Sequence, residues 1–116
     1  MFTVTKEFRF EAAHSLPHLP VGHKCRNVHG HSYWFEVAVS SPELDWRGFV
    51  IDYAEISEAV KPIAAHLDHE DLNQLFDFAT TAENLAKWIY DEVRRSVEID
   101  SITLKETATT SVIYKP

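Results

Sequence analysis

Cysteine is almost absent from this sequence, since Cys25 is the only one among 116 residues. A single thiol cannot form an intrachain disulfide, which fits a reducing compartment and leaves Cys25 as a packing residue, a metal ligand or a reactive group. Glycine and proline are also scarce, with 3 and 5 copies, so no segment has the composition of a flexible linker. We therefore expect a single domain that spans residues 1–116.

Basic residues are in deficit as well. Lys and Arg number 11 against 18 Asp and Glu, and the net charge of -7 argues against a nucleic-acid binder, which normally has a basic face. An anionic small-molecule substrate stays compatible with this balance if the few cations cluster locally. The first residues lack a basic segment followed by an apolar run, and no apolar stretch is long enough to cross a bilayer. We expect a cytoplasmic protein without nucleic-acid or membrane partners.

Two segments alternate apolar and polar side chains with the period of a strand that has one buried face. The apolar face of residues 3–14 ends in His14. The apolar face of residues 29–39 begins with His29 and His31. An antiparallel pairing of the two strands would bring these three histidines to one place.

The segment 52–67 has apolar residues at helical spacing. Asp52 and Glu55 have the spacing of a capping box, which predicts that the helix starts there. Pro62 lies inside the segment and predicts a kink or a break.

Thr80 and Glu83 form a second capping signature before another amphipathic segment, and short strands are predicted over residues 102–106 and 111–115. The order strand, strand, helix, helix, strand, strand predicts an α+β domain, in which two helices cover one face of a four-stranded antiparallel sheet. Such a sheet has two open edges, so we expect subunits to associate through them.

The three histidines are the strongest candidates for chemistry. His29 and His31 are two residues apart, so on a strand they project from the same side, and His14 can supply a third imidazole. Three neutral imidazoles suit zinc and leave one coordination position open for water or substrate. Iron held by two histidines and a carboxylate fits less well, because Glu36 points to the other face.

Five segments extend this pattern along the chain: residues 10–14, 25–31, 67–69, 81–83 and 105–107. In order and spacing they resemble the 6-carboxytetrahydropterin synthase branch of the 6-pyruvoyl-tetrahydropterin synthase superfamily. The resemblance covers essentially the whole chain. The three-residue gap between Cys25 and His29 resembles this branch, whereas the 6-pyruvoyl enzymes typically have a longer gap.

The resemblance implies a tunnelling fold (T-fold), in which subunits join their sheets into an oligomeric β-barrel with active sites at subunit boundaries. The expected homo-oligomer is a hexamer. The resemblance also implies a set of site residues: zinc ligands His14, His29 and His31, the general acid–base Cys25, the proton-transfer pair Asp68 and His69, and the pterin-binding residues Glu106 and Thr81. A carboxylate suits the last role because it can accept hydrogen bonds from the adjacent ring N–H and amino group of a pterin.

The implied reaction is a zinc-dependent conversion of 7,8-dihydroneopterin triphosphate to 6-carboxy-5,6,7,8-tetrahydropterin, with release of acetaldehyde and triphosphate, in queuosine biosynthesis. The 6-pyruvoyl reaction on the same substrate is the nearest alternative. A third interpretation is a non-catalytic oligomeric module, whose structural zinc ion is bound by Cys25 and the three histidines.

Several residues keep a second interpretation. Asp68 can cap a turn after the first helix, and Lys24 and Arg26 can be solvated loop charges or contacts for phosphate. Glu106 lies on an apolar strand face, where a buried carboxylate requires a ligand or a lysine nearby. Thr80 stands where relatives have proline, so a less rigid loop is expected before the second helix.

Overall fold

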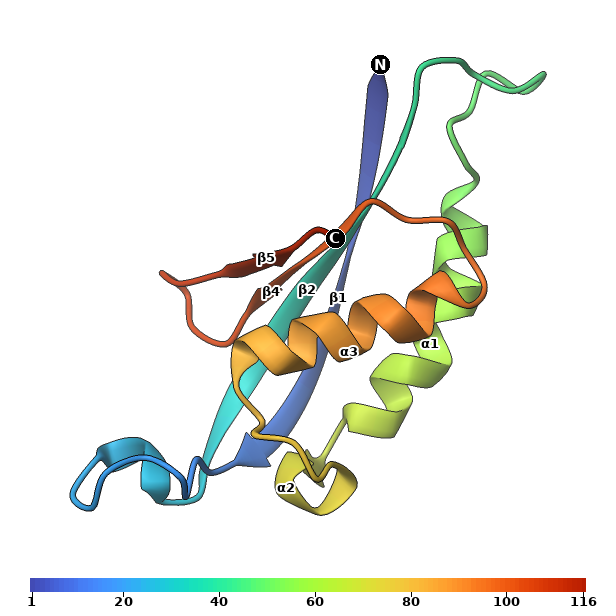
Figure 1. Ribbon diagram of the computed structural model, residues 1–116. Helices are drawn as coiled ribbons and strands as arrows, with labels where there is room; N and C mark the ends of the chain where they lie inside the picture. Colours follow the sequence, from blue (N-terminus) through green and yellow to red (C-terminus); the bar gives the residue numbers. More distant parts are fainter.

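Two 13-residue strands form the long axis of the molecule (Figure 1). The computed structural model describes all residues from 1 to 116. Strand β1 (Phe2–His14) pairs antiparallel with β2 (His29–Ser41) along its whole length, in a register that places His14 opposite His29. The antiparallel pairing expected from the sequence is therefore confirmed, and the last pair of the ladder is a pair of histidines.

The complete sheet has five strands in the order β3-β1-β2-β4-β5. Strands β4 (Ser101–Lys105) and β5 (Val112–Tyr114) continue the antiparallel arrangement next to β2. Strand β3 (Glu70–Asp71) pairs parallel to the end of β1, so the prediction of four antiparallel strands is wrong. A two-residue strand is too short to show the alternation that reveals a strand in a sequence.

Both long helices, α1 (Tyr53–Leu67) and α3 (Ala82–Arg94), lie on one face of the sheet as expected (Figure 1). Two short elements were not predicted from the sequence. The helix α2 (Leu72–Leu75) follows β3, and the 3-10 helix η1 (Lys24–Arg26) lies in the loop between β1 and β2. Both lie near the end of the sheet that carries the histidines.

Helix α1 begins where the sequence predicts and does not break. The Asp52 side chain accepts a hydrogen bond from the backbone N–H of Ala54 at 2.9 Å, rather than forming the predicted box with Glu55. The helix continues through Pro62 to its end. The helix is not broken at Pro62, so of the two predicted outcomes the break is wrong. Packing of the opposite, buried face outweighs the backbone hydrogen bond that proline cannot make.

Helix α3 begins one residue later than its capping signature suggests. The side chain of Thr81 accepts from the backbone N–H of Asn84 at 3.2 Å, so Thr81 is the N-cap and the prediction of Thr80 is wrong. Thr80 is instead buried, with only 1% of its surface exposed, and contacts His14. Either threonine has a side chain that can cap a helix. Thr80 contacts His14 instead, and Thr81 is the residue that caps α3.

One cluster of 18 buried apolar residues fills the space between the helices and the sheet. The rings of Phe10 and Tyr33 stack in this core with centroids 4.7 Å apart, directly beside the histidine end of the sheet. The opposite sheet face is polar, and on it the Arg9 guanidinium lies 4.2 Å from the centre of the Trp34 ring. The hydrophobic core therefore contacts the histidines only on the face of the sheet that the helices cover.

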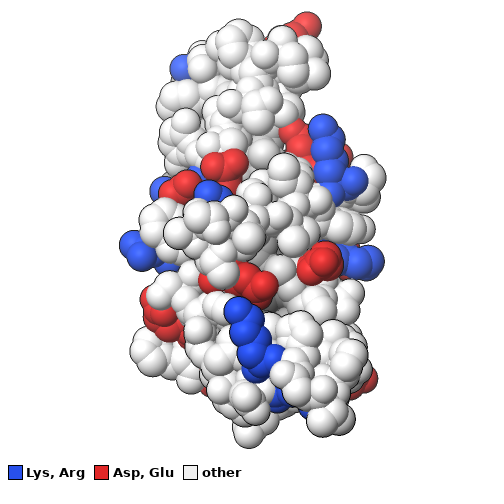
Figure 2. Space-filling view, turned by 90° about the vertical axis from the view of Figure 1, so that its left-hand side faces the viewer, with Lys and Arg blue, Asp and Glu red and all other residues white.

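Basic and acidic side chains are interspersed on the face of the molecule shown in Figure 2, which has no continuous basic surface. Lys87 and Asp91 form an ion pair along α3, with Nζ and Oδ2 2.9 Å apart. No helix combines the length and the apolar character needed to cross a membrane.

Replacing Leu85 by alanine tests the packing of α3 on the sheet. Leu85 is fully buried, so Leu85→Ala is expected to lower the free energy of unfolding by about 2–5 kcal/mol, the usual cost of such a cavity. The matched control Lys87→Ala, on the exposed face of the same helix, is expected to change stability little. Urea unfolding followed by circular dichroism measures both, and equal effects would show that α3 is not anchored through Leu85.

Candidate functional site

Three imidazoles converge at the end of the β1–β2 ladder. His14 ends β1, His29 begins β2 opposite it, and His31 follows on the same side of β2. The ring centroids are 4.6 Å apart for His14 and His29, 4.8 Å for His29 and His31, and 5.1 Å for His14 and His31. One nitrogen of each ring lies within 4.8 Å of the others, so the three can hold a metal ion. We call this group the histidine cluster.

Backbone carbonyls orient two of the three rings. The Nδ1 atom of His14 lies 2.8 Å from the carbonyl oxygen of Thr80, and that of His29 lies 2.7 Å from the carbonyl oxygen of Asn27. A carbonyl only accepts, so Nδ1 of each ring carries the proton and donates it. The lone pair of Nε2 is then free for a metal ion, which is the usual arrangement of metal-binding histidines.

The buried histidine of the cluster has an unsatisfied atom. His14 is 2% exposed, and its Nε2 atom has no hydrogen-bond partner. A buried polar atom without a partner is costly, and a metal ion would satisfy this one. The three histidines therefore suit a metal ion that binds imidazole nitrogens.

The surroundings favour neutral imidazoles. Burial lowers the pKa of His14 below its ordinary value, and the rings of His29 and His31 lower it further, against the opposing effects of the Thr80 carbonyl and Glu106. Burial also lowers the pKa of His31, with Glu106 opposing. Neutral imidazole is the form that binds a metal, so the lowered pKa values of His14 and His31 favour metal binding by these two rings.

Glu106 lies at the edge of the cluster, in the bend that follows β4. Its Oε2 atom is 3.8 Å from Nε2 of His31 and 3.9 Å from Nε2 of His14. The Tyr33 hydroxyl beneath the cluster is buried without a partner, and burial, together with the Glu106 carboxylate, raises its pKa. Glu106 is 30% exposed, its nearest side-chain partners are the imidazoles of His14 and His31, and no lysine forms an ion pair with it.

Two hollows meet at the start of β2 and share Gly30, His31 and Ser32. One has a volume of about 470 Å³ and is also lined by Trp34 and Glu106. Such a volume suits a small molecule, and this hollow borders the cluster through His31 and Glu106.

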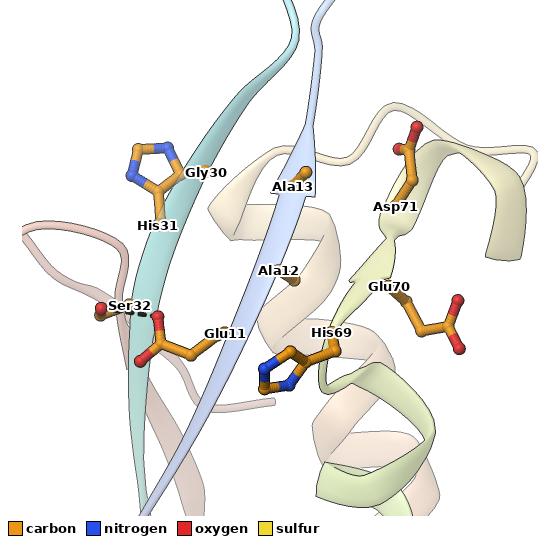
Figure 3. Close-up of a pocket in the computed structure, with 9 residues that line it drawn as sticks. All are labelled: Glu11, Ala12, Ala13, Gly30, His31, Ser32, His69, Glu70 and Asp71. Carbon is orange, nitrogen blue, oxygen red and sulfur yellow. Dashed lines mark hydrogen bonds between the residues drawn. The ribbon is translucent and has the colours of Figure 1, made fainter.

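The second hollow has a volume of about 520 Å³ (Figure 3). His69 and Glu11 line it, and the Glu11 carboxylate accepts a hydrogen bond from the Ser32 hydroxyl at 2.7 Å. In Figure 3 strand β1 runs between His69 and His31. The structure therefore does not bring His69 into the histidine cluster of its own chain.

Asp68 and His69 form a hydrogen-bonded pair after α1. Asp68 is the C-cap residue, and its two carboxylate oxygens accept from the backbone N–H of Glu11 at 2.8 Å and from Nδ1 of His69 at 2.9 Å. Both hydrogen bonds lower the pKa of Asp68, and the bond from the Glu11 backbone has the larger effect. His69 has a left-handed backbone with φ of 60°, and its side chain is 79% exposed. The pair presents an oriented imidazole to solvent.

Cys25 lies in η1 and is half-buried. Its sulfur is not among the ligand atoms that converge in the histidine cluster, an arrangement that does not favour a closed four-ligand site. The neighbouring Arg26 guanidinium donates to the carbonyl oxygens of Pro17 and Leu19, so it ties the loop together. Thr81, a predicted substrate contact, accepts a hydrogen bond as the N-cap of α3.

Sequence reasoning missed three groups around the cluster. Tyr33 continues the alternating face of the two β2 histidines, so its buried hydroxyl could have been found from the spacing alone. The carbonyls of Asn27 and Thr80 leave no such signal, because a backbone acceptor can belong to any residue type. Both carbonyls belong to loop residues, and the conformation of each loop places its carbonyl beside a histidine ring.

Comparisons with known proteins agree with this architecture. The chain is 35% identical to the 6-carboxy-5,6,7,8-tetrahydropterin synthase of Synechocystis, over 98% of this chain and 93% of that protein. It is 29% identical to the 6-pyruvoyl tetrahydrobiopterin synthase of Drosophila melanogaster, over 97% of this chain and 78% of that protein. The structure of 6-pyruvoyl tetrahydropterin synthase from Caenorhabditis elegans superposes with a TM-score of 0.88 at 25% identity, covering 99% and 95% of the two chains.

The family itself is matched along nearly the whole chain. Residues 3–116 fit the description of 6-pyruvoyl tetrahydropterin synthase. The match includes both long strands, the histidine cluster and Glu106. The chain therefore belongs to the 6-pyruvoyl tetrahydropterin synthase family.

Proposed function

We propose that this protein is a zinc-dependent 6-carboxytetrahydropterin synthase. It converts 7,8-dihydroneopterin triphosphate and one water molecule to 6-carboxy-5,6,7,8-tetrahydropterin, acetaldehyde and triphosphate, as a step of queuosine biosynthesis in the cytoplasm. The observation that carries the proposal is the histidine cluster with Glu106 at its edge, beside a hollow of about 470 Å³. The similarity to the Synechocystis enzyme over 98% of the chain supports the choice of reaction.

His14, His29 and His31 would hold the zinc ion. When bound, the ion supplies Lewis acidity toward oxygen atoms of the substrate side chain. Three protein ligands keep a coordination position free for those oxygens, as catalytic zinc sites require. The hydrogen bonds from His14 and His29 to backbone carbonyls hold the rings in place during this contact.

Glu106 anchors the pterin in this proposal. Glu106 lines the hollow, and its carboxylate can accept two hydrogen bonds from the adjacent ring N–H and amino group of the pterin. The backbone after β4 places it next to His31, so a pterin held by Glu106 has its side chain near the cluster. Thr81 contributes a further polar contact to the substrate.

Cys25 and the pair of Asp68 and His69 move protons in this proposal. The Cys25 thiol is free, and it lies four residues before the first β2 histidine, on the loop that closes this end of the sheet. Asp68 accepts from Nδ1 of His69, which leaves Nε2 of that ring as the atom that exchanges a proton with substrate.

The outer edge of β1 supports assembly into a homo-oligomer. Strand β3 pairs only with Ala12 and Ala13, so most of the backbone groups on that edge have no strand partner within the chain. An exposed edge of this length invites pairing with another subunit. We propose a hexamer whose subunits join their sheets into a barrel, with the exposed His69 at a boundary between subunits.

Product analysis with purified protein tests the reaction. With 7,8-dihydroneopterin triphosphate as substrate, we expect acetaldehyde and the 6-carboxy product in equal amounts, measured by a coupled dehydrogenase assay and by mass spectrometry. The second candidate is the 6-pyruvoyl reaction, which the similarity to the Drosophila enzyme supports. A 6-pyruvoyl product without acetaldehyde would replace the first proposal by the second.

Cys25→Ala is expected to retain one zinc ion per chain and to lower kcat by about 10²–10⁴-fold, because a positioned acid–base group contributes that much. Zinc content is measured by atomic emission after dialysis. His29→Ala is the comparison, since loss of a ligand is expected to remove the zinc as well as the activity. If the zinc also leaves with the Cys25 thiol, the site is a structural four-ligand centre and the catalytic proposal is wrong.

Glu106→Gln tests the pterin anchor. The amide keeps the size of the side chain but replaces an acceptor oxygen by a donor, so kcat/KM is expected to fall by about 10–100-fold, equivalent to the loss of a charged hydrogen bond. Zinc content is expected to stay at the wild-type value. A loss of zinc at unchanged pterin affinity would instead assign Glu106 to the metal.

A further inference from the structure

The chain is held in an unusual way directly after His14. The β1–β2 ladder ends with His14, and the next backbone groups belong to Ser15. The Asn73 side chain binds both of them: its Oδ1 accepts from the Ser15 N–H at 2.9 Å, and its Nδ2 donates to the Ser15 carbonyl at 2.8 Å. A single carboxamide from α2 therefore pairs with the backbone of Ser15, just beyond the two residues of β1 that pair with β3.

Thr80 connects this pair of bonds to the His14 ring. Its carbonyl accepts from Nδ1 of His14 at 2.8 Å, and its hydroxyl lies 3.3 Å from the same nitrogen. The hydroxyl is also 3.2 Å from Oδ1 of Asn73 and 3.5 Å from the Ser15 carbonyl oxygen, and a hydroxyl can donate to either acceptor. One network thus joins the ring of a cluster histidine to the backbone that follows it.

The network restricts both ways in which the ring can move. The two bonds to Ser15 fix the backbone next to His14, and the bond to the Thr80 carbonyl fixes the rotation of the ring and its tautomer. Thr80 is 1% exposed and His14 is 2% exposed, so water does not compete for the bond between the His14 ring and the Thr80 carbonyl. The unpartnered Nε2 of His14 is consequently held on the side of the other two histidines.

We propose that Asn73 and Thr80 are positioning residues that hold the His14 imidazole in place and thereby set the affinity of the histidine cluster for its metal ion. The inference rests on the proposed function, since it presupposes that the cluster binds a metal. Partners of this kind typically change metal affinity by about 10–100-fold when they are removed. Neither residue touches the ion or the substrate in this arrangement.

The Thr80 hydroxyl provides the first test. Thr80→Val removes the hydroxyl at nearly constant volume, Thr80→Ser keeps it, and Thr103→Val is the matched control on β4. Zinc affinity is measured by competition with a chromophoric chelator. We expect Thr80→Val to bind zinc about 10-fold more weakly than the wild type, whereas Thr80→Ser and Thr103→Val stay within about twofold of it.

Asn73→Ala provides a second variant that does not alter Thr80, and it is expected to weaken zinc binding by about 10–100-fold. Because both residues belong to one network, the double variant is expected to lose less than the product of the single losses. The visible absorption spectrum of the cobalt-substituted protein adds a readout that a purely structural role would not move, since it reports the ligand geometry. In both single variants we expect a spectrum different from that of the wild type.

The outcomes separate this inference from the proposed function. If the wild type binds zinc and both single variants bind it equally well with unchanged cobalt spectra, the positioning role is wrong and the proposed function is untouched. If Thr80→Ser loses as much affinity as Thr80→Val, the hydroxyl is not the cause and the inference fails. If the wild type itself binds no zinc, the proposed function falls, and this inference falls with it.

Discussion

The pairing register of β1 and β2 is the constraint on which the rest of the structure depends. It places His14 opposite His29 and puts His31 on the same side of the sheet. Side chains alternate between the two faces of a strand, so a slip of one residue would move a histidine to the polar face. The two strands pair over 13 residues, and their apolar side chains must all face the helices. Core residues far from the histidines therefore fix the register that brings the histidines together.

The hydrophobic core and the histidine cluster are continuous. The stacked rings of Phe10 and Tyr33 precede His14 and follow His31 on the same two strand faces, so the cluster closes the core at one end. The same burial that stabilises the fold disfavours charge on His14 and His31, which keeps their imidazoles in the form that binds metal. The packing of the core and the convergence of three neutral metal-binding side chains are therefore two consequences of one arrangement.

The other residues of the proposed site come from irregular backbone around the end of the β1–β2 ladder. Cys25 lies in a 3-10 turn, Glu106 in the bend after β4, and His69 at a left-handed position after α1. In such an arrangement, substitutions in the loops can alter the reaction while the three histidines at the strand ends stay the same. This separation agrees with the presence of 6-carboxy and 6-pyruvoyl enzymes among the relatives of one fold.

The sequence by itself determined what repeats with a regular period. The alternation of residues 3–14 and 29–39 predicted both long strands and the face that carries the histidines, and Asp52 marked the start of α1. These features are local, because strand and helix periods and capping bonds involve residues close in the chain.

Only the tertiary structure decided which isolated groups meet. The two-residue strand β3, the burial of Thr80 in place of a capping role, and the bonds from Asn73 to Ser15 depend on contacts between segments more than 50 residues apart. Such contacts have no period, and a backbone carbonyl carries no mark of its residue type. They depend on the folded core, because a buried polar group needs a partner and only the three-dimensional arrangement of the loops determines which one lies near it.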